Sequence, residues 1–211
     1  IPAGVLTLPI YDAWIPSPQQ SGYGFSNLND NLESDDYSQD GQVIAYAEPM
    51  PGRGMNLIFM GDGFTSQEAG ADGLYERKMA QGIEALFTYE PYKSYRNYFN
   101  IYIVKVVSPQ NGVSQPGYGR RSALGVTYAD ETSSKMSLQR EVMENYAAKV
   151  PGYGQMGEAV VCVIANSKRH GGTTYLPAQG NNYAIGTLAS SFETTLVHEL
   201  GGHAIGLLGD E

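Results

Sequence analysis

Strong positive charge is the first thing that this sequence lacks. Its 13 Lys and Arg residues stand against 22 Asp and Glu residues, which gives a formal net charge of −9. Proteins that hold nucleic acid or anionic membranes present basic surfaces, so this balance argues against both as partners. The sequence also lacks any apolar run of about 18 residues, the minimum for a membrane-spanning helix, so no membrane insertion is predicted.

Cysteine is almost absent as well. The one cysteine, Cys162, cannot form an internal disulfide, and it lies in the apolar run 159–165, where a thiol ordinarily serves as a small core residue. Hydrophobic residues make up 42% of the chain and charged residues 17%. This composition predicts a folded chain with one sizeable core, or a domain with a small annex.

The first 49 residues differ from the rest in composition. Residues 5–10 and 42–47 are predicted strands, separated by a stretch rich in Pro, Ser, Gly, Asn and Asp. We therefore interpret residues 1–49 as a linker or the remnant of an N-terminal accessory domain. Residues 36–41 imitate the start of a calcium loop, but Ala47 stands where that loop needs a carboxylate, so a solvated acidic turn is favoured.

A regular order of strands and helices begins near Met55. Apolar runs at residues 56–60, 100–107 and 159–165 predict three strands, the second with one face partly polar. Residues 65–87 and 138–150 predict helices, and residues 166–189 predict a loop. The pairs Thr65/Glu68 and Ser190/Glu193 are spaced as capping boxes, the second of which would open the last helix. This order predicts an α/β fold in which a sheet packs against two long helices.

Two of the three histidines flank a glutamate in the last predicted helix, in the run His198-Glu199-Leu200-Gly201-Gly202-His203. Neutral imidazoles are good zinc ligands, and a carboxylate beside the first can act as general base toward a metal-activated water. Zinc peptidases usually place two histidines four residues apart, on one helical face. Here the spacing is five, which would separate the rings by about 140° on an α-helix. A π-bulge at the glycine pair would bring them back together.

A catalytic zinc needs a third protein ligand and one open position. Gly206 stands three residues after His203, and Asp210 and Glu211 follow. This resembles the metzincin extension, in which a glycine lets the chain leave the helix and return a third ligand. We predict Asp210 as that ligand, with Glu211 as the alternative. A core helix with merely hydrogen-bonded histidines explains less, because it leaves the glycine and the Asp-Glu pair without a role.

A series of short motifs also occurs in a recognisable order. They are Gly61-Asp62-Gly63-Phe64-Thr65 with Glu68, Glu90-Pro91-Tyr92, Phe99-Asn100, Ser108, Gly112, Asn166, His170-Gly171-Gly172 and Leu208-Gly209-Asp210-Glu211. Together they resemble the family typified by the bacterial IgA peptidase, a group of secreted, metzincin-like zinc endopeptidases, over about residues 50–211. There are two departures. The family usually has one residue fewer between Glu199 and His203, and it tends to have Tyr where His170 stands, which makes His170 an extra polar group near the site.

The resemblance implies a metzincin-like zincin catalytic domain at residues 50–211, with a mixed twisted sheet, a backing helix and an active-site helix. It implies a zinc endopeptidase that is secreted, periplasmic or on the bacterial cell surface, and that takes a protein or peptide substrate. Zn²⁺ would be held by His198, His203 and Asp210, with Glu199 as the catalytic base. Residues 160–165, continuing into 166–168, would lie along the cleft and pair with substrate, although a plain core strand fits the apolar part equally well.

The seven methionines all precede the His-Glu motif. Metzincin-like enzymes carry a methionine-containing turn beneath the zinc, in a C-terminal subdomain. We therefore expect that this subdomain is absent from these residues and that the native chain continues beyond Glu211. If the additional glycine prevented chelation, the alternative would be a catalytically degenerate, secreted module that binds protein or glycan.

Overall fold

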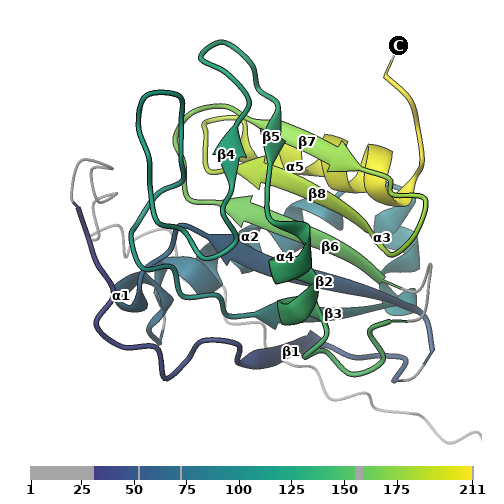
Figure 1. Ribbon diagram of the computed structural model, residues 1–211. Helices are drawn as coiled ribbons and strands as arrows, with labels where there is room; N and C mark the ends of the chain where they lie inside the picture. Colours follow the sequence, from purple (N-terminus) through teal and green to yellow (C-terminus); the bar gives the residue numbers. More distant parts are fainter. Residues whose placement is uncertain (1–30, 52, 72, 155–158, 211) are drawn as a thin grey trace, which may run out of the picture. The chain divides into compact units, whose positions relative to one another are not determined.

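A six-stranded mixed sheet organises the part of the chain that the structure describes, which is residues 31–51, 53–71, 73–154 and 159–210 of a computed structural model (Figure 1). The predicted strand at residues 5–10 and the alternative ligand Glu211 lie outside the described residues. Four inner strands run parallel, and an antiparallel strand closes each edge. In spatial order the strands are β1 (Val43–Ala47), β3 (Phe99–Val104), β2 (Met55–Asp62), β6 (Ala159–Ala165), β8 (Asn182–Thr187) and β7 (Gly172–Tyr175).

Helices cover both faces of this sheet, so the predicted mixed α/β class is confirmed (Figure 1). One face carries α2 (Leu74–Leu86), α5 (Phe192–Leu196) and the π-helix η2 (Val197–Ile205), and the other carries α4 (Arg140–Ala147). The remaining elements are α1 (Ser66–Ala69), α3 (Tyr92–Tyr95), the 3-10 helix η1 (Arg96–Tyr98) and the ribbon of β4 (Thr127–Tyr128) with β5 (Met136–Ser137). None of the helices in the described ranges is long and apolar enough to cross a membrane.

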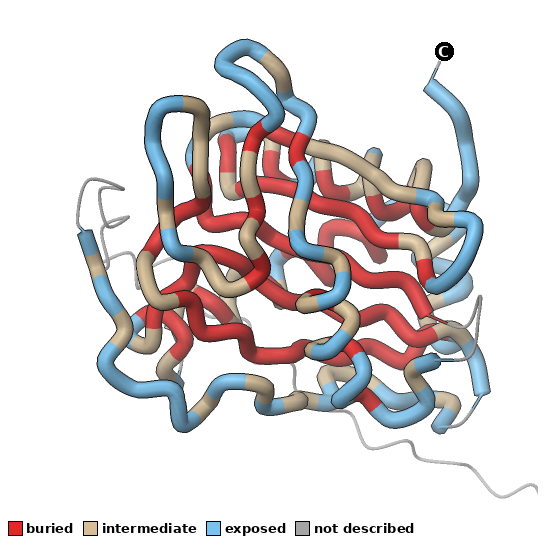
Figure 2. The backbone as a smooth tube through the Cα atoms, in the orientation of Figure 1, coloured by how far each residue is buried: buried red, intermediate tan, exposed pale blue. Residues whose placement is uncertain are grey.

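Alternate residues of the inner strands enter two separate cores. In β2, Leu57 and Phe59 pack toward α2, whereas Ile58 and Met60 pack toward α4. Figure 2 shows the inner strands buried along their length. Strand β3 is buried at every residue, and the alternate residues Asn100 and Tyr102 place polar groups there that bond to Asn56 and Glu48. Because helices cover both faces of the sheet, the sequences of these strands are nearly continuous apolar runs.

The predicted helix at residues 65–87 is two helices. The capping box is confirmed, since the backbone N–H of Thr65 donates to Oε2 of Glu68 at 2.9 Å. The chain then breaks between α1 and α2, where a Cβ on Gly73 would lie 2.3 Å from the carbonyl oxygen of Glu68. The second predicted capping box is wrong. Ser191 rather than Ser190 precedes α5, and Glu193 accepts a hydrogen bond from Gln81 instead.

The predicted loop at residues 166–189 contains two strands of the sheet. Strand β8 pairs with β6 over six residue pairs, from Val160↔Asn182 to Ala165↔Thr187, and β7 pairs with β8. Because β6 is hydrogen-bonded to β2 on its other side, it has no open edge. The prediction that residues 160–165 pair with substrate is therefore wrong, and β7 is the edge strand instead.

A buried carboxylate anchors the turn at the end of β2. The two oxygens of Asp62 accept the backbone N–H groups of Leu124 and Val126, both at 2.8 Å, and the hydroxyls of Ser108 and Ser122 at 3.2 and 2.7 Å. Burial raises the pKa of Asp62 above its usual range, and these four donors oppose that rise. The Gly61-Asp62-Gly63 motif therefore ties the segment around residues 108–126 to the sheet.

The acidic segment at residues 36–41 contains a turn, and its Asp40 carboxylate accepts hydrogen bonds from Val107 and Tyr146. Exposed Asp36 accepts the backbone N–H of Ser38 at 2.8 Å, and the remainder of the segment forms a hydrogen-bonded turn that leads into β1. Within the described ranges, the one group of three His, Cys, Asp or Glu side chains close enough to share an ion lies elsewhere.

Replacing Asp62 with Asn tests the anchoring role. An amide has one acceptor oxygen, so at least one backbone N–H would lose its buried partner and face another donor. We expect the free energy of unfolding to fall by about 1–3 kcal/mol in urea titrations. The exposed Asp36→Asn change serves as the control, with an effect within about 0.5 kcal/mol. Equal stability of the two variants would contradict the role given to Asp62.

Candidate metal centre

The two histidines of the motif lie on a π-helix. Helix η2 continues directly from α5 and covers nine residues, from Val197 to Ile205. At its end the N–H of Gly206 donates to the carbonyl of Gly201, five residues back, at 2.9 Å. A turn of this width brings residue i+5 close to residue i. The widened turn predicted from the spacing is confirmed, and it extends over the whole motif rather than being confined to the glycine pair.

The two glycines of the motif have different surroundings. A Cβ on Gly201 would lie 3.0 Å from Cε2 of Tyr92 and 3.1 Å from Cδ1 of Leu86. The Tyr92 hydroxyl also donates a short hydrogen bond to the Gly201 carbonyl. At Gly202, by contrast, a Cβ would have no neighbour within 4 Å among the described residues, apart from the adjoining backbone of its own helix. Gly201 therefore allows close packing against α2 and α3, whereas Gly202 faces open space.

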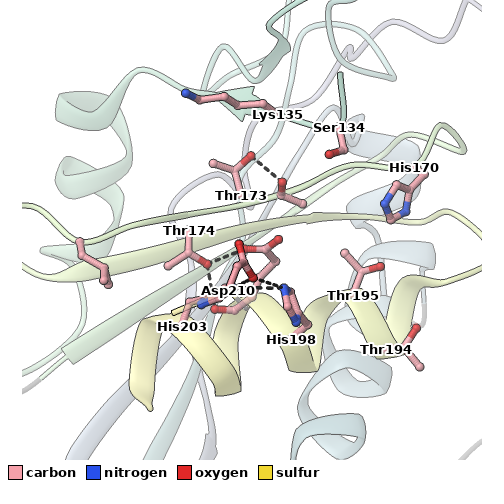
Figure 3. Close-up of a pocket in the computed structure, with 13 residues that line it drawn as sticks. Ser134, Lys135, His170, Thr173, Thr174, Thr194, Thr195, His198, His203 and Asp210 are labelled. Atoms are coloured by element: carbon pink, nitrogen blue, oxygen red, sulfur yellow. Dashed lines mark hydrogen bonds and ion pairs between the residues drawn. The ribbon is translucent and has the colours of Figure 1, made fainter. Parts of the chain in front are cut away.

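Three candidate ligand atoms converge above this helix (Figure 3). Nε2 of His198 lies 3.0 Å from Nε2 of His203, and Oδ1 of Asp210 lies 3.4 and 3.1 Å from them. Around a tetrahedral zinc with bonds of about 2.0–2.1 Å, neighbouring ligand atoms are separated by about 3.3 Å. The three separations match the edges of such a tetrahedron, so this set of side chains fits zinc and leaves a fourth position open.

A backbone carbonyl fixes the ring of His203. Nδ1 of His203 lies 2.6 Å from the carbonyl oxygen of Leu208, which can only accept a hydrogen bond. In the neutral ring the proton is therefore on Nδ1, and the Nε2 lone pair faces His198 and Asp210, as a metal ligand requires. This bond is the main cause that raises the pKa of His203; nearby Asp210 and Glu199 add to the rise, and burial opposes it.

The return of the chain to Asp210 depends on Leu207 more than on the predicted glycine. Gly206 keeps helical angles, and Leu207 takes the left-handed conformation at φ 54°. The N–H of Leu208 then donates to the carbonyl of Gly202 at 3.0 Å, which reverses the chain. Glycine is still required at position 206, because a Cβ there would lie 2.8 Å from the Gly202 oxygen.

Glu199 is held by an element that the sequence did not assign to the site. The hydroxyl of Thr174, in β7, lies 2.7 Å from Oε2 of Glu199 and 2.8 Å from its carbonyl oxygen. A Cβ on Gly172 would lie 2.7 Å from the other carboxylate oxygen, Oε1. The motif at residues 170–172 pointed to this stretch, but nothing in the sequence distinguishes Thr174 from other threonines.

A cavity of about 710 Å³ opens in front of Glu199 and the three candidate ligands. His170 lines it and pairs through Nδ1 with the Ser191 hydroxyl at 2.9 Å, so the extra polar group expected there does lie beside the site. Ser134 and Lys135 line another part of the cavity, from the β4–β5 hairpin.

Arg169 holds that hairpin in place. Its guanidinium lies over the ring of Tyr128 at 4.1 Å, and its Nη2 donates to the carbonyls of Asp130, Glu131 and Ser133 at 2.8–2.9 Å. One arginine thus satisfies three carbonyls of the hairpin that lines the cavity.

Comparison with known families matches the chain to the family described as IgA Peptidase M64 over residues 46–211. The chain belongs to this family. The resemblance drawn from the short motifs is therefore confirmed, and the mixed sheet with its helices is consistent with a peptidase domain. A search of curated proteins found no match.

The structure divides the motifs of this IgA peptidase family member into two groups. Asn166 donates to the carbonyl of Gly63 at 2.9 Å and to Glu68 at 3.1 Å, and the Gly112 N–H donates to the same Gly63 carbonyl at 2.8 Å. Together with Asp62 these residues form a buried polar network that shapes the fold. The His-Glu helix and the segment that returns Asp210 form the second group, which contains the converging candidate ligands.

Two matched alanine variants test the packing of the π-helix. Gly201→Ala places a methyl group against Tyr92 and Leu86, so we expect the free energy of unfolding to fall by about 1–3 kcal/mol. Gly202→Ala meets no neighbour and should leave stability unchanged or raise it by up to about 1 kcal/mol, because alanine favours helix. Urea denaturation of both variants measures the difference, and a reversed order would contradict the packing described.

Proposed function

We propose that this protein is a zinc-dependent endopeptidase that hydrolyses peptide bonds in protein or peptide substrates. The observation that carries the proposal is the convergence of two imidazole nitrogens and a carboxylate oxygen beside Glu199, in one open cavity. Two histidines and a carboxylate suit zinc, and three protein ligands leave the open position that a catalytic site needs. Membership of a peptidase family supports the same conclusion.

In this proposal His198, His203 and Asp210 hold the metal, which supplies Lewis acidity toward water and the scissile carbonyl. Glu199 removes the proton of the attacking water and later delivers it to the leaving amine. The adjacent position of Glu199 and His198 in the helix keeps base and metal together. The carbonyl of Leu208 keeps the His203 ring in the tautomer that presents Nε2.

Strand β7 is our candidate for positioning an extended substrate. It is the edge strand of the sheet beyond β8, and Gly172, Thr173 and Thr174 line the cavity. Peptides often bind by adding a strand to an exposed sheet edge, with side chains entering neighbouring pockets. This role replaces the one that the sequence suggested for residues 160–165.

The wider assignments are also proposals. We assign residues 50–211 to a metzincin-like catalytic domain, with α2 as its backing helix and η2 as its active-site helix. Strand β1 belongs to the same sheet, so the linker or accessory element predicted at residues 1–49 is confined in this proposal to the residues before β1. We propose that the protein acts outside the cytoplasm, as a secreted, periplasmic or cell-surface enzyme. The family match and the arrangement of α2 and η2 against one face of the sheet support the assignment of the catalytic domain.

Substitution within the His-Glu motif tests the function. Glu199→Gln removes the base but no ligand, so peptide hydrolysis should fall by at least about 100-fold while zinc remains bound. His203→Ala removes a ligand and should abolish stoichiometric zinc. His170→Ala is the matched control for metal content, because that histidine is not among the three converging ligands. Mass-spectrometric metal analysis and a broad peptide library provide the two readouts.

Two results would overturn the assignment. Full activity of Glu199→Gln would contradict the base, and equal zinc in His203→Ala and the wild type would contradict the ligand set. A wild-type protein that keeps zinc but cleaves nothing in the library would instead favour the alternative of a non-catalytic module that binds protein or glycan.

A further inference from the structure

Two residues of β7 enclose the carboxylate of Glu199 from one side. Gly172 and Thr174 are two positions apart in a strand, so they face the same side, toward the π-helix. In Figure 3, Thr174 points toward the histidine helix and Thr173 points to the opposite side of the strand. The partners agree with this view, because the Thr173 hydroxyl accepts the backbone N–H of Met136 whereas the Thr174 hydroxyl meets Glu199.

The hydroxyl of Thr174 contacts both the side-chain carboxylate and the backbone carbonyl of Glu199. Its single hydroxyl proton has two acceptors within reach, Oε2 of Glu199 at 2.7 Å and the carbonyl oxygen of the same residue at 2.8 Å. The hydroxyl therefore ties the side chain of Glu199 to its own backbone. Both residues are half-buried, so this hydrogen bond is partly shielded from competing water.

The other carboxylate oxygen lies over a residue without a side chain. A Cβ on Gly172 would lie 2.7 Å from Oε1 and 3.1 Å from Cγ of Glu199. The carboxylate thus rests against the backbone of β7, in space that only glycine leaves open. With Oε2 engaged by Thr174, Oε1 is the oxygen left to accept a proton from water.

We propose that Thr174 is a positioning residue that fixes the carboxylate of Glu199 in the orientation required of the general base, with Gly172 providing the space. The inference rests on the proposed peptidase function and adds a residue to it. A glutamate side chain has several rotatable bonds, and a base displaced by about 1 Å can lose about 100-fold in rate. The hydroxyl acts through Glu199 and need not touch the substrate.

Two variants of Thr174, one without and one with the hydroxyl, provide the kinetic test. Thr174→Val keeps the shape but removes the donor, so we expect kcat to fall by about 10- to 100-fold, while KM and zinc content stay unchanged. Thr174→Ser restores the donor and should keep kcat within about threefold of the wild type. Thr127→Val, at a half-buried threonine of β4, controls for the general effect of this substitution in a strand.

A structural comparison tests the inference independently of turnover. Crystal structures of the wild type and Thr174→Val should show the Glu199 carboxylate turned away from β7 in the variant alone. The inference is overturned if the carboxylate keeps its position, or if Thr174→Val retains kcat within about twofold. If the wild type cleaves no peptide, the proposed function fails, and the crystal comparison still decides whether Thr174 orients Glu199.

Discussion

Two imidazoles five residues apart in a helix can bind the same metal ion only if that helix is wider than an α-helix. Helix η2 meets this constraint over its whole length, and its neighbours stabilise the unusual backbone. The Tyr92 hydroxyl donates a hydrogen bond to the carbonyl of Gly201, and the N–H of Leu208 donates one to the carbonyl of Gly202. This chain reversal after Gly206 also places the Leu208 carbonyl beside His203. It brings Asp210 close to both histidines. Helix width, ring orientation and the third ligand thus depend on one another.

The surrounding fold holds this helix from two directions. On one side Leu200 and Ala204 are buried in the core that α2 and the sheet share, which fixes the helix axis. On the other side β7 contacts Glu199, and the hairpin held by Arg169 continues the lining of the cavity. Glu199 and three candidate ligands therefore lie between a rigid core and a sheet edge, in a cavity open to solvent.

Much of the fold could be predicted because its inner strands are strongly apolar. Strands β2, β3 and β6 lie between helices on both faces, so each is a nearly continuous apolar run that predicts a buried strand from the sequence alone. Strands β7 and β8 have no such apolar run, because their sequences contain Gly, Asn and Thr, and β7 has only four residues. The break between α1 and α2 and the shift of the last helix start from Ser190 to Ser191 are local details. Spacing alone does not determine them.

The site was predictable where chemistry imposed a requirement. The spacing of His198 and His203 demanded a wider turn, and the residues after Gly206 offered a carboxylate at a suitable distance. The residue that actually reverses the chain, Leu207, gives no such signal, because a leucine rarely takes the left-handed conformation. The place of Thr174 in the site could not be predicted from the sequence for a different reason. Its role arises only when β7 is placed beside η2, and no local pattern encodes that placement.

We propose that the side chains of His198, His203 and Asp210 hold one metal ion on the π-helix η2. The most direct measurement is a crystal structure of the zinc-loaded protein with diffraction data collected at the zinc absorption edge. We predict one anomalous peak about 2.0–2.2 Å from Nε2 of His198, Nε2 of His203 and Oδ1 of Asp210, with the wide turn intact. Well-ordered histidines splayed apart, with no peak between them, would contradict the account.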